Sequence, residues 1–203
     1  MANFNWHIES YRKGSAIWQS DYLWRRGQWS HIGDVVASGC GNLPAWCHGD
    51  PALFFAASDT YERQNGSACR HLVVTLPREL CLADWISLVE ALIAGDLGNK
   101  PYQYAIHNKG DDGEEHPHAH ILYSDRVPDG LDRAASLFFC RANPKSPELG
   151  GCRKDSGGQS PKQLRLAVIG RKKLWQDLQN EALKVRGHSV RVDYRSGESN
   201  PNP

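Results

Sequence analysis

The alternation of apolar and polar positions along the chain predicts a mixed α+β protein. Short runs with period-two alternation or many β-branched residues predict strands at residues 2–8, 70–76, 102–107, 118–123 and 190–195. Apolar residues that recur with a helical period predict helices at residues 15–26, 51–65, 82–97 and 164–185. Segments 28–50 and 141–161 lack a sustained period and are expected to be loops. This order favours an α+β fold in which helices cover a central antiparallel sheet, mainly on one face.

Capping and turn residues set the expected boundaries of these elements. Gly14-Ser15 offers a break and an N-cap before the first helix, and Asp50-Pro51 offers an N-cap and an initial proline for the second. The polar segment 108–115 suits the turn of a hairpin between two strands. Residues 1–196 are expected to form one domain, and residues 197–203 a disordered tail.

Composition narrows the class of protein. With 203 residues, of which 40% are hydrophobic, the chain can bury one core without disulfide staples. Its six cysteines show no C-x-x-C spacing, so reduced thiols are expected. No apolar stretch approaches the ~20 residues of a membrane span, and the N-terminus lacks the pattern of a signal peptide. A cytoplasmic protein without membrane insertion is therefore expected.

The net charge of +1 conceals an asymmetry along the chain. Residues 151–203 contain 11 Lys and Arg against 5 Asp and Glu, which gives +6, whereas residues 1–150 carry −5. Such a basic segment can bind a polyanion or can be an ordinary solvated helix face. If it binds nucleic acid, the expected phosphate contacts are Arg171, Lys172 and Lys173.

Histidines are concentrated in one short part of the sequence. His118 and His120 point to the same face of a strand because side chains alternate, and His107 ends the preceding strand of the same hairpin. Three neutral imidazoles at this spacing can bind one metal ion and leave coordination positions open for a substrate. The alternative is that these histidines are exposed strand residues. His116 precedes Pro117 at the edge of the loop and is expected to be a bystander or an outer-shell group.

A tyrosine in the first predicted helix is a candidate nucleophile. Tyr22 follows Asp21, and a phenol needs help from a metal ion or a base to lose its proton. Tyr11 competes for this role, and a surface position is the plain alternative for both. Four neighbours are candidates for DNA contacts: Arg25 and Arg26 for a phosphate, and Trp24 and Trp29 for stacking on bases, with core packing as the alternative for each Trp.

Several short motifs occur in an order that resembles the MobA/MobL plasmid-mobilisation relaxases, the MobQ branch of the HUH endonucleases. The matching segments are Ser15-Ala16 with Asp21-Tyr22 and Arg26-Gly27, Tyr61–Gly66, Leu76–Leu80, His107 with His118–His120 and Ser124–Arg126, and Gly187-His188 with Arg191–Ser196. No single segment is decisive, but the ordered set is specific and covers nearly the whole chain.

The resemblance implies an HUH relaxase fold, with a metal ion on a central antiparallel sheet and a tyrosine helix above it. It implies nicking of one strand of plasmid origin-of-transfer DNA through a 5′-phosphotyrosine, which is later rejoined. Carried over by position, Tyr22 is the nucleophile, and His107, His118 and His120 bind a divalent ion, Mg²⁺ or Mn²⁺. The implied partners are single-stranded origin DNA, auxiliary mobilisation proteins and a type IV secretion coupling protein. Such a protein can enter the recipient with the strand.

The chain departs from the family pattern at two places. Relatives often carry acidic residues near the metal on the strand before "LP", where this chain has His71-Leu72-Val73-Val74. His71 and Asp21 are thus candidates for hydrogen bonds that orient the metal ligands, and either Asp21 or water is the candidate proton acceptor for the nucleophile. Tyr194 stands where many relatives have His. Two alternative functions remain: an HUH-type replication initiator or DNA-binding module, and a metal-dependent phosphodiesterase in which water attacks.

Overall fold

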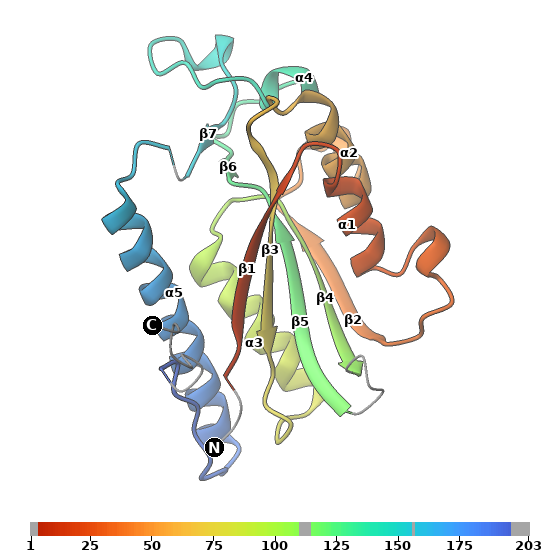
Figure 1. Cartoon of the computed structure of the whole chain (residues 1–203), viewed down its shortest axis with the longest axis vertical. Coiled ribbons are helices and arrows are strands. Elements are labelled where there is room, and N and C mark those ends of the chain that lie inside the picture. The colour runs from red at the N-terminus through yellow and green to blue at the C-terminus, as the bar shows by residue number, and fades with distance from the viewer. Residues whose placement is uncertain (1–3, 110–114, 156, 196–203) are drawn as a thin grey trace, which may run out of the picture.

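A five-stranded antiparallel sheet forms the centre of the molecule (Figure 1). The computed structural model describes residues 4–109, 115–155 and 157–195. From edge to edge the strands are β1 (Trp6–Arg12), β3 (Ser67–Thr75), β5 (Glu115–Tyr123), β4 (Tyr102–Lys109) and β2 (Val35–Gly41). The predicted hairpin is confirmed, since β4 and β5 pair antiparallel at the centre of the sheet. Segment 110–114 of its turn and tail 197–203 lie outside the described residues.

Helices cover both faces of the sheet, whereas the sequence pattern predicted cover mainly on one. Helices α1 (Ala16–Leu23) and α2 (Pro51–Tyr61) share one buried cluster with side chains of the sheet, and α3 (Leu82–Asp96) and α5 (Pro161–Val185) share the other. Figure 1 shows α1 and α2 on one side of the strands and α3 and α5 on the other. The three central strands β3, β4 and β5 thus bury side chains in two different cores.

Short elements complete the chain and connect the layers. They are η1 (Gly27–Trp29), η2 (Ala45–Cys47), β6 (Arg126–Val127), α4 (Ala135–Phe138), η3 (Pro147–Leu149) and β7 (Arg153–Lys154). Strands β6 and β7 pair with each other as a second, small sheet. Among the described residues, no helix combines the length and the apolar character needed to cross a membrane.

Strand β2 lies inside segment 28–50, which was predicted to be a loop. It forms the edge of the sheet beside β4. Its glycines hide the strand pattern, and close packing explains them: a Cβ at Gly39 would lie 2.6 Å from the ring of Tyr104, and one at Gly41 equally close to the hydroxyl of Tyr102. The rings of β4 therefore occupy the space that β2 side chains would need.

The predicted strand at 190–195 is wrong, because this segment lies along α5 without forming a ladder. Asn180 exchanges two hydrogen bonds with the backbone of Val192, at 3.0 and 2.9 Å. The backbone N–H of Tyr194 donates to Gln176 at 3.0 Å. The apolar alternation reflects packing on a helix, with Val192 buried, and helix side chains satisfy the backbone that a strand partner would have paired.

Candidate functional site

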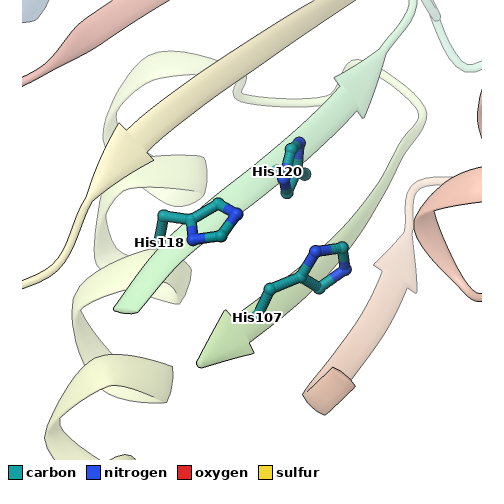
Figure 2. A group of neighbouring side chains, drawn as sticks. All are labelled: His107, His118 and His120. Atoms are coloured by element: carbon teal, nitrogen blue, oxygen red, sulfur yellow. The ribbon is translucent and has the colours of Figure 1, made fainter. Parts of the chain in front are cut away.

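Three imidazoles meet on the sheet face that α1 and α2 cover. His107 on β4 lies directly opposite His118 on β5, and His120 follows two residues later on the same side of β5. One ring nitrogen of each histidine lies within 4.8 Å of the others. Figure 2 shows the three rings projecting from the two neighbouring strands into one space. The predicted convergence is confirmed, and the three residues form a group that can bind a metal ion.

Hydrogen bonds at the second nitrogens orient two of these rings. Nδ1–H of His118 donates to the backbone carbonyl of His116 at 2.7 Å, which leaves the Nε2 lone pair of His118 available. Nδ1 of His120 lies 2.8 Å from Nε2 of His71 on β3. His71 and His116 thus each hydrogen-bond to a candidate metal ligand, His71 through its ring and His116 through its backbone carbonyl. This arrangement fits a metal site, because ligating histidines usually hold their other nitrogen in a hydrogen bond.

His107 is held at both nitrogens. A guanidinium can only donate, so Nδ1 accepts from Arg25 at 3.2 Å, and Nε2–H donates to the carbonyl of Leu23 at 3.2 Å. A metal ion that takes His107 as a ligand must replace one of these two hydrogen bonds. Arg25 is the group that competes with a metal ion for the Nδ1 lone pair.

Burial keeps the cluster neutral. Desolvation lowers the pKa of His107 to about 4 and the pKa of His71 to about 4. Burial also lowers the pKa of His118 and, more strongly, that of His120. Neutral imidazoles have the lone pair that a metal ion needs, so the site is prepared for a cation at neutral pH.

Tyr22 lines the same cavity as the three histidines. The cavity has a volume of about 530 Å³, and Arg25, Asp34 and Lys109 also line it. The Arg25 guanidinium lies over the Tyr22 ring, 4.3 Å from its centroid. Asp21 precedes Tyr22 on α1, but it is not among the described residues that line this cavity. The structure therefore brings the tyrosine helix and the histidine cluster together.

Asp34 is a residue of this cavity that the sequence did not indicate. It lies just before β2 and receives two hydrogen bonds from Arg25, at 2.8 and 2.7 Å. These bonds lower the pKa of Asp34, so its carboxylate is ionised and paired. Its Oδ2 also lies 3.6 Å from Nδ1 of His107. A lone Asp in a segment predicted to be a loop carries no pattern, and only the unrecognised strand β2 brings it to the site.

Buried contacts fix α1 above the sheet. The Ser20 hydroxyl donates to Gln103 on β4 at 2.6 Å, and the Gln103 amide donates to the Ser20 carbonyl at 2.9 Å. At the end of α1, Arg25 adopts a left-handed backbone conformation with φ 52°. A non-glycine residue rarely tolerates this conformation, and the bidentate pair with Asp34 offsets its cost. The turn thereby directs the Arg25 guanidinium back over the Tyr22 ring.

Comparison with known proteins identifies the family. The family model described as "MobA/MobL family" matches residues 9–201. The chain belongs to the MobA/MobL family. It is 36% identical over 201 residues to the "43 kDa relaxation protein" of Salmonella typhimurium, covering 97% of this chain and 54% of the relative. It is 33% identical over 188 residues to "Mobilization protein A" of Escherichia coli, covering 91% of this chain and 25% of the relative. The chain thus spans about half of the first relative and a quarter of the second.

Solved structures confirm the fold that the sequence predicted. One, described as "Molecular Basis of Vancomycin Resistance Transfer in Staphylococcus aureus", superposes with a TM-score of 0.71 at 19% identity over 95% of this chain and 98% of that chain. The metal-bound complex of the conjugative relaxase TrwC with oriT DNA superposes with a TM-score of 0.57 at 10% identity, over 93% and 73% of the two chains. At these identities the likeness concerns the fold alone.

The other residues that the sequence placed near the candidate nucleophile of this MobA/MobL protein have structural partners. The Trp24 indole donates to the carbonyl of Tyr104 on β4 at 2.9 Å, so the ring is anchored against the sheet. Arg26 pairs with Asp50 at 2.8 Å and lies over the Trp24 ring. Their contacts with DNA stay predictions, and Trp24 now has the packing role that was its alternative.

Tyr11 does not join Tyr22 in the cavity. It lies on β1, where its hydroxyl donates to Glu9 at 2.6 Å. Burial and this hydrogen bond raise the pKa of Tyr11 to about 12. Of the two tyrosines, Tyr22 is therefore the better placed nucleophile.

The predicted basic contacts 171–173 lie on α5, across the sheet from the histidines (Figure 1). Arg171 donates to Asp96 on α3 at 2.5 Å and to the hydroxyl of Tyr123 at 3.0 Å. It thus connects α5 to α3 and to the sheet. DNA contact by residues 171–173 stays a prediction. It requires that the DNA reach the face of the sheet opposite the histidines.

Proposed function

We propose that this chain nicks one strand of plasmid origin-of-transfer DNA and becomes attached to it through Tyr22. The observation that carries this proposal is that Tyr22 and the three histidines line one cavity. Membership of the MobA/MobL family supports origin-of-transfer DNA as the substrate. The relatives described as relaxation and mobilization proteins support the same substrate. Both relatives are longer than the region that matches this chain. The activity of the whole relative is therefore only proposed for this chain.

In the proposed reaction, the Tyr22 oxygen attacks the phosphorus and the bond from phosphorus to the 3′ oxygen breaks. The phenolic proton is lost and the 3′ oxygen takes up a proton, so the phosphodiester is exchanged for a 5′-phosphotyrosine. Because one diester replaces another, the step can be reversed to rejoin the strand. Arg25 and the Trp18–Trp29 pair hold the tyrosine ring in place, and Arg25 is itself fixed by Asp34.

The residues present fit a divalent cation. His107, His118 and His120 would hold it, and when bound it would stabilise negative charge that develops on the scissile phosphate. We propose Mg²⁺ or Mn²⁺ as the working ion. Imidazole also binds Zn²⁺, Ni²⁺ and Cu²⁺, so the ion found in a purified sample does not by itself identify the working one.

The proposal extends to partners and location. We propose that single-stranded origin DNA is the substrate, that auxiliary mobilisation proteins and a type IV secretion coupling protein assist, and that nicking takes place in the cytoplasm, from which the attached chain can enter the recipient. A water-dependent phosphodiesterase would leave no attached protein. An HUH-type replication initiator would form the same adduct, and the MobA/MobL family match favours mobilisation over it.

The test compares two tyrosine variants on single-stranded origin DNA with a divalent ion present. Tyr22→Phe keeps the ring and removes the hydroxyl, so DNA binding should persist while cleavage and the covalent adduct disappear together. Tyr11→Phe is the matched control and should retain both. Denaturing gels and peptide mapping of the adduct give the result. An adduct at Tyr11, or free nicked DNA without attached protein, would contradict the assignment.

A further inference from the structure

Three aromatic rings meet beside the histidine cavity. Trp18 and Tyr22 are one helical turn apart, and their rings lie parallel, within 2°, with centroids 5.7 Å apart. Trp29, from η1, presents an edge-to-face contact to each of them, at 5.4 and 5.2 Å. The candidate nucleophile is thus one member of an aromatic cluster formed by Trp18, Tyr22 and Trp29.

Trp18 remains open although it packs in this cluster. Its exposed fraction is 45%, which is high for the side chain with the largest apolar surface. One side of the ring stacks on Tyr22, so the other side is the one on which a further ring can stack. Trp24, only six residues later, is by contrast half-buried and bound through its indole N–H to the sheet. An indole left open beside a reactive residue is a surface on which another flat ring can stack.

The surroundings of this indole suit a nucleic-acid strand. The cavity beside Tyr22 contains the side chain of Lys109, which can attract a phosphate. Arg25 lines it as well, but its charge is balanced by Asp34. Stacking of unpaired bases on aromatic rings next to cationic groups is the usual way in which proteins hold single strands.

We propose that Trp18 is the stacking platform for the unpaired base of a nucleotide that flanks the scissile phosphate. This inference rests on the proposed function, since it assumes that a strand reaches Tyr22. Stacking on Trp18 would fix the strand one helical turn from the attacking hydroxyl. Trp29 acts through its edge contacts, which keep Trp18 and Tyr22 parallel, and is a positioning residue.

The experiment measures binding of single-stranded origin DNA in the Tyr22→Phe background, so that no strand is cleaved during the measurement. Trp18→Ala should weaken binding about 5- to 150-fold, the range expected for one stacked base. Trp18→Phe should retain most of the affinity. Tyr61→Ala is the matched control, because Tyr61 has an exposed fraction of 46% and lies at the end of α2. It should bind like the parent.

Abasic nucleotides then locate the contact. One of the two bases that flank the nick should be the stacking partner. When that base is removed, Trp18→Ala should lower the DNA affinity by less than about twofold, because the stacking partner is gone. Unchanged affinity in Trp18→Ala overturns the proposal, and so does a full loss that persists when either flanking base is removed. Retained circular dichroism and metal affinity exclude misfolding as the cause.

Failure of nicking is distinguishable from failure of stacking. If wild-type protein forms no covalent adduct, the proposed function is wrong. The stacking role is then decided on oligothymidylate against an abasic strand of equal length. A preference for oligothymidylate that disappears in Trp18→Ala supports stacking, and a preference that persists contradicts it.

Discussion

His71 is the residue at which this chain differs most clearly from the family pattern around a candidate metal ligand, His120. Its Nε2 lies 2.8 Å from Nδ1 of His120, and its side chain is buried. A neutral imidazole stands on the strand where relatives often carry acidic residues. Such an imidazole can fix the orientation of His120, but it adds no negative charge near the ion.

Replacing His71 by Ala should weaken binding of Mn²⁺ by about 10- to 100-fold. The change leaves Nδ1 of His120 without its partner in a buried position and frees the ring to rotate. Titration calorimetry with Mn²⁺ measures the effect directly, without DNA. His71→Gln, whose amide can still hydrogen-bond, should recover part of the affinity.

His7→Ala is the matched control for this experiment. His7 lies on β1 opposite Val73, on the same side of the sheet but one strand further out, and it is exposed. Its removal should leave Mn²⁺ affinity unchanged. Equal affinities of His71→Ala and wild type would show that His120 needs no support from β3.

At the scale of single residues, the sequence could predict the candidate metal ligands but only some of the groups that hydrogen-bond to them. Strand parity was enough to place His118 and His120 on one face and His107 beside them. Asp34 and the His116 carbonyl could not be found in this way, because a lone carboxylate and a backbone oxygen leave no periodic signal. Their position depends on the register of strands that are distant in the sequence.

Helix α1 carries Tyr22, and its N-terminus is held by another helix. The sequence predicted Ser15 as the cap, but the Ser15 side chain accepts no hydrogen bond from the helix and donates to Arg12. Instead, the carboxylate of Asp59 on α2 accepts from the N–H groups of Gly14, Ala16 and Ile17, at 2.7–3.1 Å. Pattern rules search for a cap next to its helix, so a cap supplied from 42 or more residues away lies outside their reach.

Asp59→Ala should lower the free energy of unfolding by about 1–2 kcal/mol, the usual cost of losing a helix cap. It should also reduce the rate of adduct formation, because α1 presents Tyr22 to the cavity. Urea unfolding and adduct kinetics measure the two effects. Thr60→Ala, one residue later on an exposed position, is the control and should change little. A stability loss with an unchanged adduct rate would show that the α1 N-terminus does not position the nucleophile.

Across the whole molecule, the division of labour follows the two faces of the sheet. Helices α3 and α5 pack the larger buried cluster on one face, while α1 and α2 leave space on the other for the histidine cavity. The strand order and the edge strand β2 were not predicted. The helices and the central strands could be anticipated from periodicity, and the relaxase fold from the family motifs. The two-sided cover could not, because it requires knowing which strand faces which helix.

Four histidines on one face, two buried and two half-buried, give the metal-free protein a distinctive dependence on pH. The pKa values of His71 and His107 fall from an ordinary 6.5 to about 4 in the folded state, and those of His118 and His120 are lowered too, all through burial. The unfolded chain therefore binds protons more readily than the folded one. Stability is retained above about pH 6.5 and is lost as the pH falls towards about 4.

Within this window, each such histidine should contribute a slope of about 1.4 kcal/mol per pH unit to the free energy of unfolding. Carboxyl groups in ion pairs, such as Asp34 and Asp155, have pKa values below 3.8 and titrate at lower pH, so the two effects separate.

Urea unfolding of the metal-free protein at several pH values measures the slope. His71→Gln should reduce it by one histidine's share, because one proton fewer is taken up on unfolding. A slope that is the same in this variant, or a stability that stays constant down to pH 4, would mean that the cluster accepts protons without unfolding. Saturating Mn²⁺ should raise the stability and extend the slope below pH 4, since the ion binds only the folded protein and competes there with protons for the same lone pairs.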